Sequence, residues 1–210
     1  YRETIKKVAE GQGKYKKQTG GHGQYGDVWL RLEPASEYGF EWRITGGVIP
    51  SKYQEAIEEG IKEAAKKGVL AGFPVMGFKA IVYNGSYHEV DSSDLAFQIA
   101  ASLAFKKVMA EAHPVLLEPI YRLKVLAPQE RVGDVLSDLQ ARRGRILGME
   151  QEGALSVVHA EVPLAEVLEY YKALPGLTGG AGAYTLEFSH YAEVPPHLAQ
   201  RIVQERAQEG

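Results

Sequence analysis

The 210-residue sequence contains no cysteine, which excludes disulfide bridges and thiolate metal sites and fits a reducing compartment. No apolar run approaches the roughly 18 residues that a membrane-spanning helix requires, and no signal peptide is recognisable. We therefore expect a cytoplasmic protein without a membrane partner. The sequence begins with Tyr1 rather than Met, which indicates a fragment of a longer protein.

The sequence also lacks an excess of charge of one sign. The net charge is −3; residues 1–118 hold 15 basic and 15 acidic side chains, and the remainder holds 9 and 12. Neither half resembles a general nucleic-acid binder, so any contact with a polyanion is confined to small surfaces and depends on shape. The local basic residues are Lys14, Lys16, Lys17, Arg31, Arg142, Arg143 and Arg145.

Glycine is abundant in one place. Between Gly20 and Gly26, five of seven residues are glycine or aromatic. Each glycine there costs roughly 1 kcal/mol in folding relative to alanine, so we expect something to approach the backbone closely. Gly21, Gly23 and Gly26 match G-x-G-x-x-G, but strand-like alternation follows from Asp27 where a dinucleotide fold needs a helix. Contact with an extended polyanion is favoured by the neighbouring lysines, a plain glycine hairpin is the alternative, and nucleotide binding is disfavoured.

The first part of the chain alternates strands with two helices. The predicted elements are strands over residues 4–18, 25–33, 40–45 and 75–83, and helices over 51–67 and 93–112. Ser51 and Gln54 have the spacing of a capping box, and Gly68 ends the first helix. The inward face of that helix carries Ile57 and Ile61. Asn84-Gly85 predicts a tight turn.

The second part predicts the order β-α-β-β-α-β, the ferredoxin-like arrangement. Its elements are a strand over 120–126, a helix over 130–143, a hairpin over 145–162, a helix from Pro163 and a strand over 184–190. We expect Gly144 to end the first of these helices, and the second to carry the apolar residues Leu164, Val167, Leu168 and Tyr171. A closing helix follows over 196–208. The domain boundary falls at residues 113–119.

Long motifs throughout the chain resemble the C-terminal part of bacterial elongation factor G, a translational GTPase. The motifs are residues 1–5 (YRETI), 18–26 (QTGGHGQYG), 46–50 (GGVIP), 72–74 (GFP), 85–93 (GSYHEVDSS), 117–120 (LEPI), 141–144 (ARRG), 146–150 (ILGME) and 190–195 (HYAEVP). The resemblance implies an α/β (α+β) protein with three parts. These are a fourth-domain-like part over 1–118, similar to the second domain of ribosomal protein S5, a fifth-domain-like ferredoxin fold over 119–195, and a helix over 196–210 that packs back on the body.

The resemblance also implies a role on the ribosome. The nucleotide domain of the family is absent from these residues, so we expect no enzymatic activity in this chain. GTP and magnesium are expected only in that absent domain. The implied partners are the small-subunit decoding centre, the large-subunit GTPase centre and the tRNA–mRNA duplex during translocation. A monomer is expected.

In the family, two loops of the first domain form an RNA-contacting tip. On this sequence they comprise Gln18, Thr19, Gly20, Gly21, His22, Gly23, Gln24 and Tyr25, with Tyr87, His88, Glu89, Asp91 and Ser92. Arg142, Arg143, Thr178, Gly179 and Gly180 match positions of possible ribosome contact in the second domain.

Other interpretations of these residues stay open. His88, Glu89 and Asp91 resemble a metal-binding cluster, but a third ligand at a suitable spacing is missing, so we expect no metal. Asp91, Ser92 and Ser93 are candidate caps of the following helix, with Asp91 or Ser92 favoured. The two arginines end a helix, where the dipole favours cations in any protein.

Two departures from the family pattern bear on function. His22 stands where the family usually has arginine, and residues 178–183 lack the family's polar side chains at Gly179 and Ala181. Both changes weaken phosphate affinity. They indicate a specialised paralogue acting in ribosome recycling or rescue as an alternative to ordinary translocation. A tetracycline-protection factor and a phosphate-binding enzyme that uses the glycine loop rank lower.

Overall fold

The computed structural model describes the backbone of residues 1–210 and their side chains, apart from the side chain of Thr19. The contacts divide the chain into two compact units. Unit 1 comprises Tyr1–Leu117 and Val194–Gly210, and unit 2 comprises Glu118–Glu193. Both units combine strands with helices, so the predicted mixed α/β class is confirmed. In the part of the chain that the structure describes, no helix has the length and apolarity to span a membrane.

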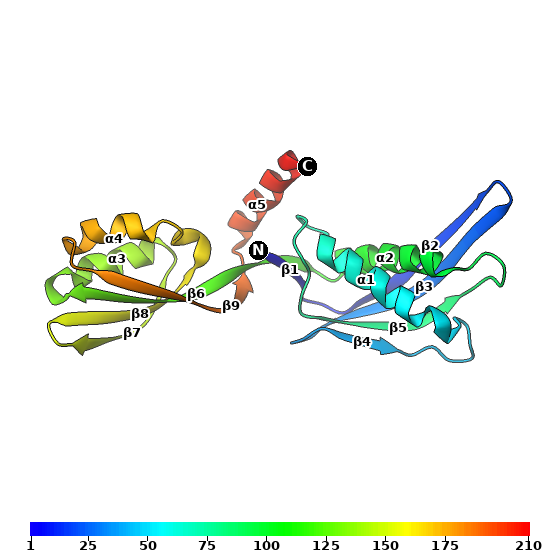
Figure 1. Ribbon diagram of the computed structural model, residues 1–210, viewed down its shortest axis with the longest axis horizontal. Helices are drawn as coiled ribbons and strands as arrows, with labels where there is room; N and C mark the ends of the chain where they lie inside the picture. Colours follow the sequence, from blue (N-terminus) through cyan, green and yellow to red (C-terminus); the bar gives the residue numbers. More distant parts are fainter. The chain divides into compact units, whose positions relative to one another are not determined.

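Unit 1 is built on a four-stranded sheet in the order β2-β3-β5-β4, with helices on one face (Figure 1). Its elements are β1 (Arg2–Ile5), β2 (Ala9–Thr19), β3 (His22–Pro34), β4 (Gly39–Trp42), the 3₁₀-helix η1 (Ser51–Tyr53), α1 (Gln54–Lys67), β5 (Phe78–Ser86), α2 (Asp94–Glu111) and α5 (Pro196–Glu209). Strands β2, β3 and β5 are antiparallel, and β4 runs parallel to β5.

Alternate residues of β3 build the core of unit 1. Val28, Leu30 and Leu32 are fully buried among the core residues of the two helices. Ile57 and Ile61 of α1 are also fully buried, which confirms the predicted inward face of that helix. Gly68, with φ of 65°, ends α1 as predicted.

Three local predictions for unit 1 are wrong. Residues 51–53 form a 3₁₀ turn without a side-chain cap, so no capping box forms between Ser51 and Gln54. Residues 4–18 form two strands rather than one. Asn84 and Gly85 continue β5 instead of turning, because they pair with Trp29 and Val28 of β3. A Cβ on Gly85 would lie 2.3 Å from the carbonyl oxygen of Asp27. Glycine is needed there for close strand packing.

Unit 2 has the predicted β-α-β-β-α-β order. Its elements are β6 (Pro114–Pro128, whose first residues belong to unit 1), η2 (Gln129–Arg131), α3 (Val132–Ala141), β7 (Arg145–Glu152), β8 (Leu155–Pro163), η3 (Leu164–Glu166), α4 (Tyr170–Thr178) and β9 (Ala183–Glu193). Strand β6 pairs with β8 and β9, and β7 pairs with β8. The core residues come from β6, β8, α3, α4 and Val167, which precedes α4.

Two predictions for unit 2 need correction. Gly144 does not supply the left-handed residue after α3, because Arg143 does so with φ of 59°. The helix expected from Pro163 begins later, at Tyr170. That shift exposes Leu168 and Tyr171 and buries Tyr170 instead.

Helix α5 contacts the segment that follows α1 within unit 1. Arg206 donates from Nε to the carbonyl oxygen of Ala71 at 2.9 Å. Its guanidinium carbon lies 4.5 Å from the centre of the Phe73 ring. Leu198, Ile202 and Val203 are half-buried.

Candidate functional site

The glycine-rich segment is a β-hairpin with a two-residue turn. Strands β2 and β3 stay paired up to Thr19 and His22, which corrects the expectation of a loop over 18–26. Gly20 and Gly21 have φ of 55° and 102°, and a Cβ on either would meet no atom within 4 Å. These two glycines therefore serve the turn conformation, which L-residues with side chains disfavour, and leave the turn open.

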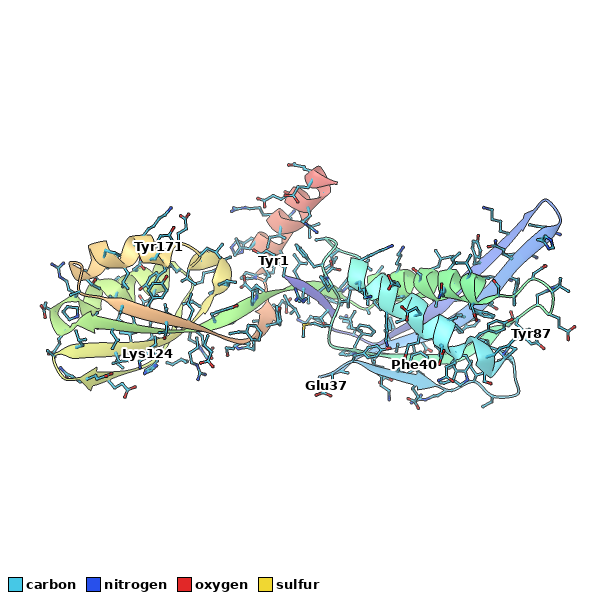
Figure 2. The ribbon with its side chains drawn as sticks, in the orientation of Figure 1. Tyr1, Glu37, Phe40, Tyr87, Lys124 and Tyr171 are labelled. Atoms are coloured by element: carbon cyan, nitrogen blue, oxygen red, sulfur yellow. The ribbon has the colours of Figure 1, made fainter. Side chains whose placement is uncertain are left out.

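A second segment, residues 87–92, docks against this hairpin. The backbone nitrogen of Tyr25 donates to the carbonyl oxygen of Asp91 at 3.0 Å. The Ser92 hydroxyl donates to the carbonyl oxygen of Tyr25 at 2.9 Å and accepts from the backbone nitrogen of His88 at 2.9 Å. A Cβ on Gly23 would lie 2.5 Å from a carboxylate oxygen of Asp91, so a larger residue there would displace the Asp91 side chain. We call residues 18–26 and 87–92 the tip; Figure 2 shows Tyr87 at the end of unit 1 from which the hairpin projects.

His88 is held so that one ring nitrogen faces solvent. Its Nδ1 accepts hydrogen bonds from the backbone nitrogens of Val90 (3.3 Å) and Asp91 (3.2 Å). An acceptor nitrogen carries no proton, so the neutral ring carries its proton on Nε2. Nδ1 also lies 3.6 Å from Oδ2 of Asp91. The side chain is 56% exposed, which leaves Nε2–H as a donor to a ligand.

The remaining tip residues divide into exposed and structural groups. Gln18, Gly20, Gly21, His22, Tyr87, His88 and Glu89 are exposed, whereas Gly23, Gln24, Tyr25, Asp91 and Ser92 are half-buried. The backbone of Thr19 lies in the hairpin, and its side chain lies outside the described residues. Asp91 and Ser92 hold the two segments together, so they are less available to a ligand.

The cap of α2 is Ser93, whose hydroxyl accepts from the backbone nitrogen of Ala96 at 3.1 Å. Ser93 is one of the three candidate caps, and the preference for Asp91 or Ser92 is wrong. The Ser92 hydroxyl is instead used within the tip. Among the described side chains, no group of three or more His, Asp and Glu residues is arranged to hold a metal ion.

Three lysines near the tip lack acidic partners among the described side chains, unlike several arginines elsewhere in unit 1. Away from the tip, Arg31 lies 2.8 Å from Glu33, and Arg43 lies 2.7 Å from Glu41. Hydrogen bonds from Arg43 and then Lys79 lower the pKa of Glu41 to about 2. The lysines at 14, 16 and 17 of β2 are exposed, and no described acidic side chain lies within ion-pair distance of them. The distal half of the hairpin is therefore a small basic surface beside exposed hydrogen-bond donors.

The geometry disfavours nucleotide binding by the glycine hairpin. Gly26 lies within β3, not before a helix, and its Cβ position would be 2.6 Å from the carbonyl oxygen of Ala96. This glycine packs β3 against the start of α2 instead of cradling a phosphate.

The arginines expected to contact the ribosome from unit 2 are engaged inside that unit. Arg143 donates to both carboxylate oxygens of Glu118, at 2.8 and 3.0 Å, and Glu118 is 3% exposed. Arg142 donates to Asp138 at 2.8 Å and to the carbonyl oxygen of Glu166 at 2.7 Å. Both side chains therefore have structural roles in this arrangement.

The loop at residues 178–183 offers mainly backbone. Thr178 is 2% exposed, and its hydroxyl donates to the carbonyl oxygen of Leu174 at 2.8 Å. Gly179 and Gly180 have φ of 66° and 85°. Only Thr178 among the three could have supplied a polar side chain, and that side chain is buried.

Asp27 and Ser86 did not stand out in the sequence, yet they lie directly beneath the tip. Asp27 is 6% exposed. A buried carboxylate needs hydrogen-bond partners, so an aspartate between a glycine hairpin and a buried strand was the available signal.

The chain matches two family models in succession. The model described as elongation factor G, domain IV, covers residues 1–113, and that described as elongation factor G C-terminus covers residues 115–202.

Curated relatives show the same similarity. Elongation factor G of Aquifex pyrophilus is 52% identical over 209 residues, which are 98% of this chain and 30% of that protein. Elongation factor G of Thermotoga maritima is 52% identical over 208 residues, covering 97% of this chain and 30% of the relative. An elongation factor G-like protein of Thermotoga maritima is also 52% identical, over 213 residues, covering 100% of this chain and 31% of the relative. The chain thus spans less than a third of the length of these relatives.

Proposed function

The chain belongs to the elongation factor G family, and on this premise we propose that it forms the ribosome-binding C-terminal part of a translational GTPase. In this proposal the tip enters the decoding centre of the small subunit and promotes movement of the tRNA–mRNA duplex. The factor acts as a monomer in the cytoplasm, and unit 2 faces the GTPase centre of the large subunit. We assign GTP and magnesium to the part of the longer factor that these residues do not include.

The observation that carries the proposal is the construction of the tip. Two segments distant in sequence meet through the hydrogen bonds of Tyr25 and Ser92. Their surface offers the exposed side chains of Gln18 and His88 beside an open glycine turn. The basic side chains of β2 add charge without acidic partners among the described residues.

These features suit the backbone of an A-form duplex. A codon–anticodon duplex presents phosphates and 2′-hydroxyls in a wide, shallow minor groove, where proteins recognise shape more than sequence. His88 offers Nε2–H, and the Gln18 amide can both donate and accept. Contact with phosphate and ribose is independent of sequence, as a factor that handles every codon requires.

A specialised role in ribosome recycling or rescue is the second candidate. The chain is 52% identical both to elongation factor G and to the elongation factor G-like protein of Thermotoga maritima, so identity does not separate the two kinds. The buried Thr178 side chain and the adjacent glycines leave residues 178–183 without a charge-assisted donor. That difference favours altered binding at the large subunit.

Single-round translocation kinetics tests the proposal in a full-length factor that carries this chain. The double variant Gln18→Ala/His88→Ala should slow translocation while GTP turnover stays near normal. The matched control is His197→Ala/Gln200→Ala, which removes the same two residue types from exposed positions of α5. Unchanged translocation in the tip variant would refute the tip assignment, whereas slow recycling with normal translocation would favour the second candidate.

A further inference from the structure

Beneath the tip, one buried carboxylate connects three neighbouring strands. Asp27 lies in β3 and is 6% exposed. Its Oδ1 accepts from Nε2 of Gln12 in β2 at 2.6 Å, and its Oδ2 accepts from the hydroxyl of Ser86, the last residue of β5, at 2.7 Å. Each carboxylate oxygen therefore holds one flanking strand.

A third partner extends this arrangement toward the tip. The Tyr25 hydroxyl lies 2.7 Å from the hydroxyl oxygen of Ser86. A serine hydroxyl has one hydrogen, which Ser86 donates to Asp27, so Tyr25 must donate to Ser86. The hydrogen bonds run from Tyr25 through Ser86 to Asp27, and we call these three residues with Gln12 the Asp27 clamp.

Tyr25 is also where the two tip segments meet. Its backbone nitrogen and carbonyl oxygen bind Asp91 and Ser92 of the second segment. Ser86 immediately precedes that segment. The clamp therefore fixes the side chain of the residue whose main chain joins the hairpin to residues 87–92.

The opposite face of the hairpin meets α2 through close packing instead of side-chain hydrogen bonds. Two glycines pack there against α2: a Cβ on Gly13 would lie 2.3 Å from the carbonyl oxygen of Ala100, and one on Gly26 would lie 2.6 Å from that of Ala96. Glycines allow the strands to approach the helix closely but contribute no side chain that interlocks with it. Val28 and Tyr15 pack into the core on that face, whereas the clamp supplies the side-chain hydrogen bonds that join β3 to its two flanking strands.

We propose that Asp27 is a positioning residue, which holds residues 18–26 and 87–92 as one rigid body at the end of unit 1. Its effect on translation rests on the proposed function of the tip. Its effect on the tip structure does not, because the hydrogen bonds lie within the chain.

Substitutions at Asp27 separate hydrogen bonding from charge. Asp27→Ala removes both acceptors. Asp27→Asn keeps the size, and its Oδ1 can still accept from Gln12 while Nδ2 donates to Ser86, which then donates to Tyr25. The bond from Gln12 keeps its direction and the two bonds through Ser86 reverse, so Asp27→Asn should preserve the clamp. Ser86→Ala interrupts the connection while leaving Asp27 in place, and Asp134→Ala controls for the loss of one exposed carboxylate elsewhere.

Hydrogen exchange of the 210-residue chain measures the clamp directly. In Asp27→Ala and Ser86→Ala, the amides of Tyr25, His88 and Ser92 should exchange roughly 10- to 100-fold faster, as expected for loss of hydrogen bonds to a charged group. The amides of Ile57 and Ile61 should keep their rates, and Asp27→Asn and Asp134→Ala should match the unmodified chain. Unchanged tip exchange in Ser86→Ala, equal acceleration of tip and core, or failure of Asp27→Asn to rescue would each overturn the proposal.

Translocation by the full-length factor then tests the consequence. Ser86→Ala should slow single-round translocation, and Asp27→Asn should not. If Gln18→Ala/His88→Ala slows translocation but Ser86→Ala has no effect on exchange, the clamp is refuted and the proposed function stands. If Ser86→Ala accelerates tip exchange but neither variant slows translocation, the clamp stands and the proposed function is refuted.

Discussion

Glu3 provides the sharpest test of how unit 1 is stabilised. It lies in β1 and is fully buried. Its carboxylate accepts hydrogen bonds from four backbone amides of the segment after α1. Oε1 accepts from Val69 (2.7 Å) and Leu70 (2.8 Å), and Oε2 accepts from Ala71 (2.9 Å) and Phe73 (3.0 Å). One side chain thus orders a segment nearly 70 residues away in sequence.

The loss of stability expected when the Glu3 carboxylate is removed follows from these four hydrogen bonds. A hydrogen bond to a charged group contributes about 1.5–3 kcal/mol, but residues 69–73 are only half-buried, so freed amides regain water. We therefore expect Glu3→Ala to reduce the free energy of unfolding by about 3–5 kcal/mol, well below the full sum. Glu3→Gln should lose nearly as much, because its NH₂ group would face two donors.

Urea unfolding followed by tryptophan fluorescence reports on unit 1 selectively, because both tryptophans, Trp29 and Trp42, lie in it. With a typical dependence of about 2 kcal/mol per M urea, the midpoint should fall by about 2 M. The control Glu63→Gln removes an exposed ion pair with Lys66 and should shift the midpoint little. A shift for Glu3→Ala no larger than the control's would refute the reasoning.

Three further predictions concern packing and ionisation. Gly60→Ala should destabilise unit 1 by about 1–3 kcal/mol in the same assay, because its Cβ would lie 2.4 Å from the carbonyl oxygen of Gln98; full stability would contradict this close helix contact. Arg143→Ala should destabilise unit 2 by about 3–5 kcal/mol in circular-dichroism unfolding, because buried Glu118 loses its partner, and a change as small as that of a surface substitution would argue against it. Burial raises the pKa of Tyr170 in the folded protein to about 12, whereas a tyrosine in the unfolded chain has a pKa near 10. Between pH 10 and 12 the unfolded chain therefore loses this proton while the folded protein keeps it, and the free energy of unfolding should fall. Tyr170→Phe should reduce that fall without destabilising unit 2 at neutral pH, since the buried hydroxyl has no hydrogen-bond partner among the described residues. An unchanged dependence of stability on pH would contradict the assignment of this titration to Tyr170.

The fold was predictable where local pattern and packing agree. Ile57 and Ile61 recur at helical spacing and are buried, and Gly68 ends their helix. Tertiary contacts decided the other cases. Gly85 resembles a turn residue but is required by the adjacent Asp27 backbone. Arg143 takes the left-handed position expected for a glycine, where it pairs with Glu118.

In the candidate site, too, the features that depend on long-range contacts could not be predicted from the sequence. Its glycines and His88 stood out in the sequence, but the pairing of Tyr25 with residues 91 and 92 depends on contacts across more than 60 positions. The roles of Ser92 and Ser93 could not be separated by spacing alone. Their hydroxyls differ only in which backbone group lies nearby.

The central claim is that the tip reaches the tRNA–mRNA duplex. The 210 residues contain no cysteine, so Tyr87→Cys, at an exposed tip position, can carry an iron chelate in a full-length factor whose other cysteines are replaced. On the ribosome, this probe should cleave decoding-centre RNA and the tRNA anticodon arm, and a probe at His197→Cys should not. Cleavage confined to other ribosomal regions, or identical patterns from both positions, would contradict the account.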